Sequence, residues 1–227
     1  MKKKDHPLIR LLINYLKVSE NIDNIKRGQE EQSIFKAPND AIYNRWVASE
    51  IYSRPSEIII LENTLYRPRH IVRLLNKAKT ICGNYPKIND KVMNAIRKSY
   101  SKECWDEVIE ELFVHYSKED LQDIMIFLTG IQVPISYEEL YDKAKLDFRN
   151  RKRKCCIIES FDDVLRSLYS VGIIGNITNG QDGPLFRWSF RGDETLLLNR
   201  DFTIHRVFWP ALSITHKTKK STHRKKL

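Results

Sequence analysis

A strong β-hairpin signal late in the chain, preceded by three helical segments, constrains the fold more than any other feature. The dipeptides Asn179-Gly180 and Asp182-Gly183 separate two β-rich runs, and such pairs adopt the positive φ angles of hairpin turns at little cost. Helical periodicity precedes them over residues 118–130, 138–148 and 160–171, and Ser136 and Ser160 are the expected N-caps of the second and third of these helices. Three helices followed by a two-stranded ribbon are typical of a winged-helix domain, which we expect over residues 117–214.

The first 116 residues show helical periodicity and no internal repeat. Between residues 58 and 61 four consecutive aliphatic residues fit a buried strand or the opening of a helix equally well. The expected helices span residues 7–18, 39–53 and 68–82. Another helix is expected to begin at Asn89 or Asp90, and residues 101–116 continue the helical pattern.

The charge distribution points to a polyanionic partner. The chain has 39 Lys and Arg against 29 Asp and Glu, a net charge of +10, and the excess lies in the segments 2–4, 149–154 and 217–226. Basic patches on a slightly acidic body favour contacts with a polyanion at defined places, although solvated tails would give the same charge pattern.

The composition also limits the compartment in which the protein is expected and the kinds of cysteine chemistry that it can carry out. No apolar run is long enough for an ordinary transmembrane helix, so we expect no membrane partner. The four cysteines lack CxxC spacing, which indicates neither a disulfide framework nor a metal site and fits a reducing cytoplasm. Residues 7–16 are interrupted by Arg10 and Asn14, unlike a signal peptide.

The winged-helix expectation gives the basic residues a role in DNA binding. The helix over 160–171 contains Asp162 and Asp163, so base reading is weakly supported and contacts would go mainly to phosphates. A winged helix used for protein contact is the alternative. The candidate nucleic-acid-binding residues are Arg149, Arg151, Lys152, Arg153, Lys154, Arg166, Arg187, Arg191, Lys219 and Lys220.

Two arginines, Arg67 and Arg69, flank Pro68 at the expected start of a helix, where the helix dipole favours phosphate oxygens and where capping or solvation would also explain them. The segment from Tyr66 to Ala78 resembles the opening of the helical lid in bacterial P-loop ATPases of the AAA+, STAND and KAP kind. In those proteins a winged helix often follows the lid. Segments 168–175, 186–188 and 202–205 resemble the C-terminal part of one such family.

The basic tail over residues 215–227 has too few apolar residues to offset the entropy cost of ordering, so we expect it to be disordered. Together with the helical periodicity, the resemblance implies a mainly α protein with a helical lid-like bundle over residues 5–116 and a winged-helix domain with a β-hairpin wing over 117–214. It implies that Arg69 is the sensor arginine that reaches the nucleotide γ-phosphate, with Arg67 as its neighbour.

The ATPase machinery itself is missing from the sequence. There is no GxxxxGK[ST] segment to bind phosphates and no hydrophobic strand ending in paired acids to hold Mg²⁺. We therefore expect no enzyme activity and no cofactor in this chain, with ATP and Mg²⁺ entering only through a separate ATPase or a missing N-terminal core. Three hypotheses stay open: a DNA-binding module, a subunit that docks on an ATPase and supplies Arg69, and, least favoured, independent nucleotide hydrolysis.

Overall fold

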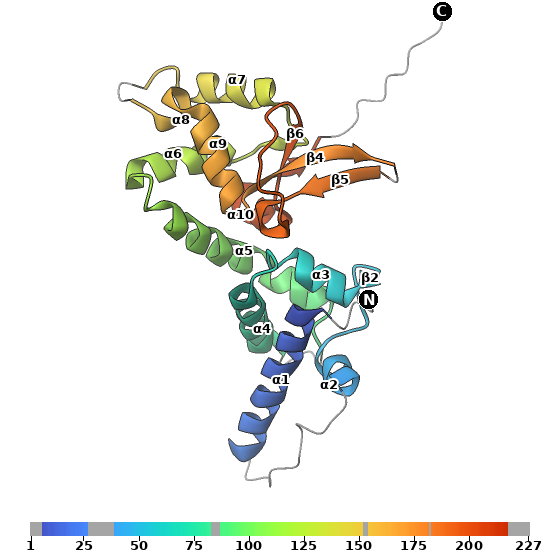
Figure 1. Ribbon diagram of the computed structural model, residues 1–227. Helices are drawn as coiled ribbons and strands as arrows, with labels where there is room; N and C mark the ends of the chain where they lie inside the picture. The colour runs from blue at the N-terminus through green and yellow to red at the C-terminus, as the bar shows by residue number, and fades with distance from the viewer. Residues whose placement is uncertain (1–5, 27–38, 83–86, 152–153, 182, 218–227) are drawn as a thin grey trace, which may run out of the picture. The chain divides into compact units, whose positions relative to one another are not determined.

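The structure is a computed structural model that describes residues 6–26, 39–82, 87–151, 154–181 and 183–217. It is mostly helical with small sheets, as the sequence predicts (Figure 1). The chain divides into two compact units, residues 1–104 and 105–227, and the division falls within helix α5 (Asp90–Leu112). The sequence places the boundary at residue 116 instead.

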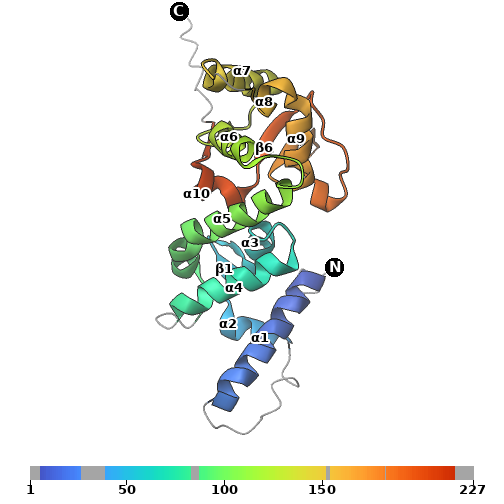
Figure 2. The same cartoon turned by 90° about the vertical axis from the view of Figure 1, so that its left-hand side faces the viewer.

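Unit 1 is built from helices around one short hairpin. Helix α1 packs against α2 and α4 (Figure 2). It buries Leu12 and Leu16 completely. The hydrophobic stripe of α4 supplies Leu74 and Leu75 to the same core. Helix α1 continues to Lys26, beyond its predicted end at residue 18. The elements are α1 (Pro7–Lys26), α2 (Asn39–Trp46), β1 (Glu50–Ile51), β2 (Arg54–Pro55), α3 (Ser56–Glu62), α4 (Pro68–Cys82) and the first part of α5.

The hairpin corrects the predicted end of the second helix. We expected that helix to continue to residue 53, but α2 ends at Trp46, and Val47 forms a bridge with Ile88. The β1–β2 turn then holds Tyr52 and Ser53 at φ values of 54° and 56°. Both central residues of the turn lie in the left-handed region, which glycine or asparagine normally occupies.

The ambiguous aliphatic run is helical. It lies within α3, whose Ile59 and Ile60 are buried. Nη1 and Nη2 of Arg54 donate to the Glu62 carboxylate, at 2.9 and 2.7 Å, and so connect the hairpin to the end of α3. This bidentate pair raises the pKa of Arg54 above its usual value.

After the C-terminal part of α5, unit 2 continues with two helices whose N-termini are set by capping boxes. Ser117 and Ser136 each accept a hydrogen bond from the backbone of the third helical residue, whose carboxylate bonds back to the serine backbone N–H. Ser160 stands at the predicted N-cap of α9, but its side chain makes no capping hydrogen bond within the described residues. The helices are α6 (Lys118–Leu128), α7 (Tyr137–Phe148), α8 (Cys156–Glu159), α9 (Phe161–Ser170) and α10 (Trp209–Leu212).

A three-stranded antiparallel sheet follows α9. Its order is β5-β4-β6, with β4 (Ile174–Gly180) in the centre, β5 (Gly183–Arg187) as the predicted hairpin partner and β6 (Asp201–Ile204) on the other side. Gly175 is required here because a Cβ at that position would lie 2.6 Å from the ring of Trp188. The short 3₁₀ segments are η3 (Ser189–Arg191) and η4 (Arg206–Phe208).

The predicted disordered tail needs a correction at its start. We placed its beginning at residue 215, but Thr215–His216 form β7, which pairs in parallel with β3 (Gln132–Val133). The backbone N–H of Lys217 also donates to Val133 at 2.8 Å. Backbone pairing therefore fixes the chain as far as Lys217.

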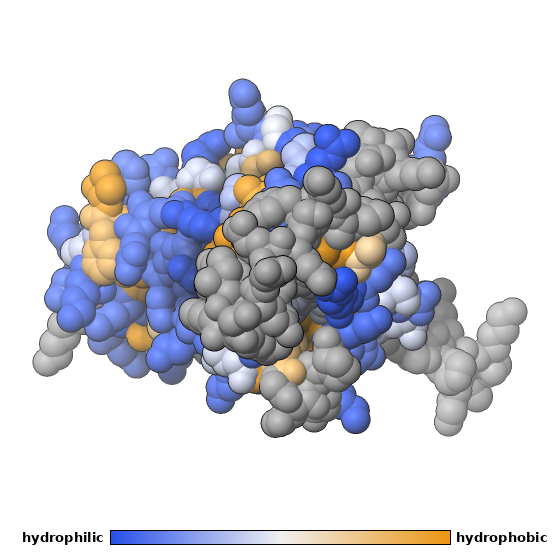
Figure 3. Space-filling view, turned by 90° about the horizontal axis from the view of Figure 1, so that it is seen from below, coloured by the Kyte–Doolittle hydropathy of each residue, from blue (hydrophilic) through white to orange (hydrophobic). Residues whose placement is uncertain are grey.

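Figure 3 shows the molecular surface from below. The described residues on that face are mostly hydrophilic, and the hydrophobic ones form small separate groups. No helix within the described ranges is long and apolar enough to cross a membrane.

Candidate functional site

The start of α4 holds the two arginines that the sequence singled out. Leu65 and Tyr66 precede it at φ values of 49° and 53°, and together they turn the chain into the helix. The carbonyl of Arg67 accepts hydrogen bonds from the backbone of His70 and Ile71, at 3.1 and 3.3 Å. Arg67 is half-buried, whereas Arg69 is exposed on the first helical turn.

Tyr100 of α5 anchors this first turn. Its hydroxyl donates to the backbone carbonyls of Asn63 and His70, at 2.9 and 3.2 Å. The tyrosine is 4% exposed and the His70 side chain is fully buried. One buried hydroxyl thus joins the end of α3, the start of α4 and the middle of α5.

An open groove of about 440 Å³ runs along α4 beside α5. Three cationic residues on its α4 side, Arg69, Arg73 and Lys77, follow one another at four-residue spacing. Sequence reasoning selected only Arg69, although this spacing on one helix face was a readable signal. The groove is lined by Arg69, Val72, Arg73, Asn76, Lys77, Thr80 and Glu103.

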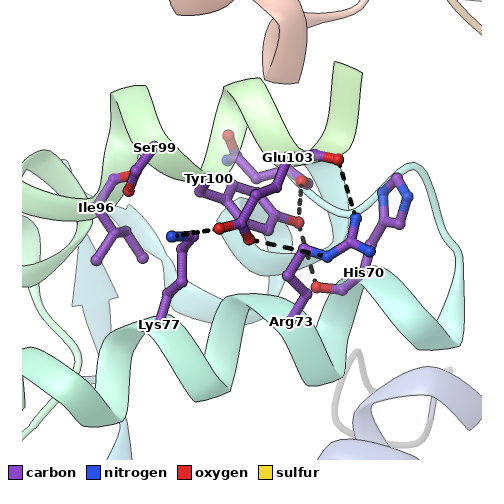
Figure 4. Close-up of polar contacts among 8 residues, drawn as sticks. His70, Arg73, Lys77, Ile96, Ser99, Tyr100 and Glu103 are labelled. Atoms are coloured by element: carbon purple, nitrogen blue, oxygen red, sulfur yellow. Dashed lines mark hydrogen bonds and ion pairs between the residues drawn. The ribbon is translucent and has the colours of Figure 1, made fainter. Parts of the chain in front are cut away.

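Glu103 of α5 faces two of these cations (Figure 4). Its carboxylate lies 2.7 Å from Lys77 Nζ and 3.9 Å from Arg73 Nε, and its backbone carbonyl accepts from Arg73 Nη1 at 3.2 Å. The Glu103 side chain is 46% exposed, so solvent ions reach this cluster. The groove therefore combines three cations with one acid on a solvent-accessible surface.

The basic segment 149–154 contains an arginine, Arg151, that stabilises the fold. Arg151 forms an ion pair with Asp123, whose side chain is 1% exposed, and its guanidinium stacks over the ring of Phe148 at 5.0 Å. The Cys155 thiol lies 3.7 Å from the other oxygen of Asp123. Arg151 therefore neutralises a buried carboxylate. The predicted neighbours Lys152 and Arg153 lie outside the described residues, as do Lys219 and Lys220.

Arg187 at the end of β5 is also committed to an ion pair. Its Nη2 lies 3.2 Å from Asp193 Oδ1, while Oδ2 of the same carboxylate accepts from the Trp188 backbone at 3.3 Å. The Tyr169 hydroxyl donates to the Asp193 carbonyl at 2.8 Å. Arg187 thus helps to hold the segment after the hairpin against α9.

The remaining predicted cations of unit 2 are exposed. Arg166 lies on α9 and Arg191 on η3, and these elements are adjacent because Ser189 Oγ donates to the carbonyls of Tyr169 and Ser170, at 2.7 and 3.1 Å. Arg149 caps the end of α7. Lys154 is 89% exposed and lies 3.5 Å from Glu159. The structure thus brings Arg166 and Arg191 to neighbouring elements.

The hairpin surface is more apolar than the sequence interpretation assumed. Leu185 and Phe186 on β5 are 59% and 46% exposed. Thr178 and Ile177 face them across the ladder on β4. Because these residues are consecutive in one strand, each face of the hairpin carries one exposed apolar side chain, which suits protein contact better than contact with phosphates.

Thiol and metal chemistry find little support. Burial and the nearby Asp120 raise the pKa of Cys156 to about 12, and burial also raises that of Cys155. Neither thiol is a ready nucleophile at neutral pH. Across the described ranges, no group of three or more His, Cys, Asp or Glu side chains could hold a metal ion.

Comparison with known proteins gives no match: no protein-family model, curated protein or solved structure is significantly similar to this chain.

Proposed function

We propose that this protein is a non-catalytic DNA-binding module whose second unit acts as a winged-helix domain. The observation that supports this most is the order and packing of α6, α7 and α9 followed directly by the β4–β5 hairpin, with exposed Arg166 and Arg191 on adjoining elements. In winged-helix proteins the helix before the wing and the wing itself commonly approach nucleic acid.

Binding would rely on phosphate contacts. The exposed face of α9 carries Asp163 beside Arg166, an unfavourable combination for a helix that reads bases in the major groove. Phosphate contacts would fall to the cations that are exposed, which include Arg149, Lys154, Arg166 and Arg191, whereas Arg151 and Arg187 are half-buried beside Asp123 and Asp193. Such binding depends strongly on salt and weakly on sequence.

The resemblance to the lid and winged-helix region of P-loop ATPases gives unit 1 a role beside a nucleotide. On that basis Arg69, which is exposed on the first turn of α4, would reach a nucleotide bound to another polypeptide or domain. The half-buried Arg67 would be its neighbour. ATP and Mg²⁺ would be held by a partner ATPase or by a core in another part of the protein. This chain would contribute recognition rather than hydrolysis.

Fluorescence anisotropy with a mixed-sequence DNA duplex at two salt concentrations tests the DNA-binding proposal. The double variant Arg166→Gln/Arg191→Gln should bind about tenfold more weakly and lower the salt slope by nearly two, because each lost phosphate contact lowers it by about 0.9. The control Lys118→Gln/Lys145→Gln removes the same charge from exposed sites on α6 and α7. Equal losses in both variants, or no wild-type binding at low salt, would reject the proposal.

A second candidate function is docking on a separate ATPase, and exposed Leu185 and Phe186 favour it. An ATPase encoded by a neighbouring gene is the partner to try. Replacing both residues with serine should then weaken that complex but leave DNA affinity unchanged, and Arg69→Ala should lower the partner's ATP turnover. Normal turnover in a verified complex with Arg69→Ala would exclude the sensor role.

A further inference from the structure

The groove on unit 1 has the geometry of a contact site for a phosphate chain. Arg69, Arg73 and Lys77 recur every four residues, so they form one stripe that extends about 12 Å along α4 at 1.5 Å per residue. A linear row of cations matches a linear row of phosphates better than it matches a single anion. The stripe lies in unit 1 and shares no residue with the cations of unit 2.

The lining indicates which phosphate compound the groove suits. Among the described residues, Val72 is the only aliphatic one that lines this groove, and none of the described aromatic rings lines it. A nucleobase would find no stacking surface there, whereas a sugar–phosphate backbone needs none. The open form of the groove also admits a polymer that continues past both ends.

Glu103 occupies the place that a phosphate would take. Its carboxylate contacts Lys77 at 2.7 Å and lies 3.9 Å from Arg73, so it serves as an internal counter-ion. Because this side chain is 46% exposed, its ion pairs are weak, and a polyanion can compete for the same cations. Removing the carboxylate should therefore strengthen anion binding rather than abolish it.

The backbone under the stripe is held in place from both sides. The Tyr15 hydroxyl of α1 donates to the Asn76 amide oxygen within the groove. The Tyr100 hydroxyl of α5 binds the His70 carbonyl one residue after Arg69. Contacts with two other helices therefore fix the helix that presents the cations, which reduces the ordering cost of binding.

We propose that the α4–α5 groove contacts the sugar–phosphate backbone of a nucleic acid through Arg69, Arg73 and Lys77, and that Glu103 is the counter-ion that the phosphates displace. This inference shares with the proposed function the premise that the partner is a nucleic acid. It adds a second contact surface on the other unit.

The test uses the full chain, a labelled mixed-sequence DNA duplex and three variants. Arg73→Gln/Lys77→Gln should weaken binding about tenfold and reduce the salt slope by nearly two. Glu103→Gln should tighten binding about threefold, and Thr80→Arg, which adds a cation to the groove lining, should do the same. If the cluster had only a structural role, Glu103→Gln would weaken DNA binding instead, because that variant loses two ion pairs and gains no new contact.

Several outcomes separate the two claims. If only Arg166→Gln/Arg191→Gln weakens binding, the groove inference is wrong and the function of unit 2 stands. If only the groove variants change affinity, the winged-helix interface is wrong and the groove stands. If inorganic tripolyphosphate binds the groove but the duplex does not compete for it, the ligand is a free polyphosphate, and the backbone inference is overturned. Glu103→Gln and Thr80→Arg that both leave duplex affinity unchanged would overturn it as well.

Discussion

Replacing Arg151 with glutamine should destabilise unit 2 before it affects any ligand. The substitution removes the Arg151 guanidinium from the Asp123 carboxylate, which is 1% exposed. Breaking a buried pair from one side costs about 3–5 kcal/mol, and we expect about 3 kcal/mol here because the Arg151 side chain keeps 28% exposure. For a unit of this size that corresponds to a drop of roughly 10 °C in Tm.

The free energy of unfolding is measured by urea denaturation followed by circular dichroism, with Arg149→Gln as the control. Arg149 is an exposed cation only two residues away, so its replacement should change stability by less than about 0.5 kcal/mol. Adding Asp123→Asn to Arg151→Gln removes the buried charge and should recover at least half of the loss.

The same variant decides whether Arg151 contributes to DNA binding. At a temperature where Arg151→Gln remains folded, its affinity for a DNA duplex should equal that of the wild type, because the guanidinium is engaged with Asp123. A fully stable Arg151→Gln protein with weakened DNA binding would refute this reasoning and restore the arginine to the binding surface.

Three further predictions concern the two units separately. Tyr100→Phe should lower the stability of unit 1 by about 1.5 kcal/mol in urea denaturation, because the hydroxyl bonded to Asn63 and His70 is lost; unchanged stability would show that these bonds contribute nothing. Ser53→Gly should increase the free energy of unfolding by about 0.5 kcal/mol and raise the Tm slightly, because glycine adopts a φ of 56° without the strain that serine has there. A lower Tm would contradict the turn geometry. With its pKa raised to about 12, Cys156 should react with iodoacetamide at pH 8 at least a hundredfold more slowly than an unperturbed thiol; mass spectrometry of the alkylated peptide measures the rate, and fast labelling would contradict its burial.

Short sequence signals correctly predicted two helix starts and the hairpin, which depend on interactions between residues close in the chain. Pro68 at the first position of α4 and Ser136 at the cap of α7 are both where the sequence places them. The Asn-Gly and Asp-Gly pairs likewise predicted the β4–β5 hairpin. Each of these signals acts within a few residues, so a single sequence displays it.

The misses come from contacts between distant residues. Helix α2 ends early where Val47 pairs with Ile88, a partner that periodicity cannot reveal. The same holds for the ion pair of Arg151 with Asp123, because a run of basic residues looks solvated until a buried carboxylate is placed beside it. The four-residue spacing of Arg69, Arg73 and Lys77 is visible in the sequence, but the pairing of two of these cations with Glu103 is not, because Glu103 lies on another helix.

The turn before α4 links the exposed arginines to the core of unit 1. Leu65 is fully buried although its φ is 49°, and Tyr66 follows at 53°. A strained turn of this kind persists only while its surroundings hold it. The first turn of α4 should therefore not fray by itself. Its amide hydrogens, such as that of His70 on the Arg67 carbonyl, should exchange with solvent only when the whole unit opens.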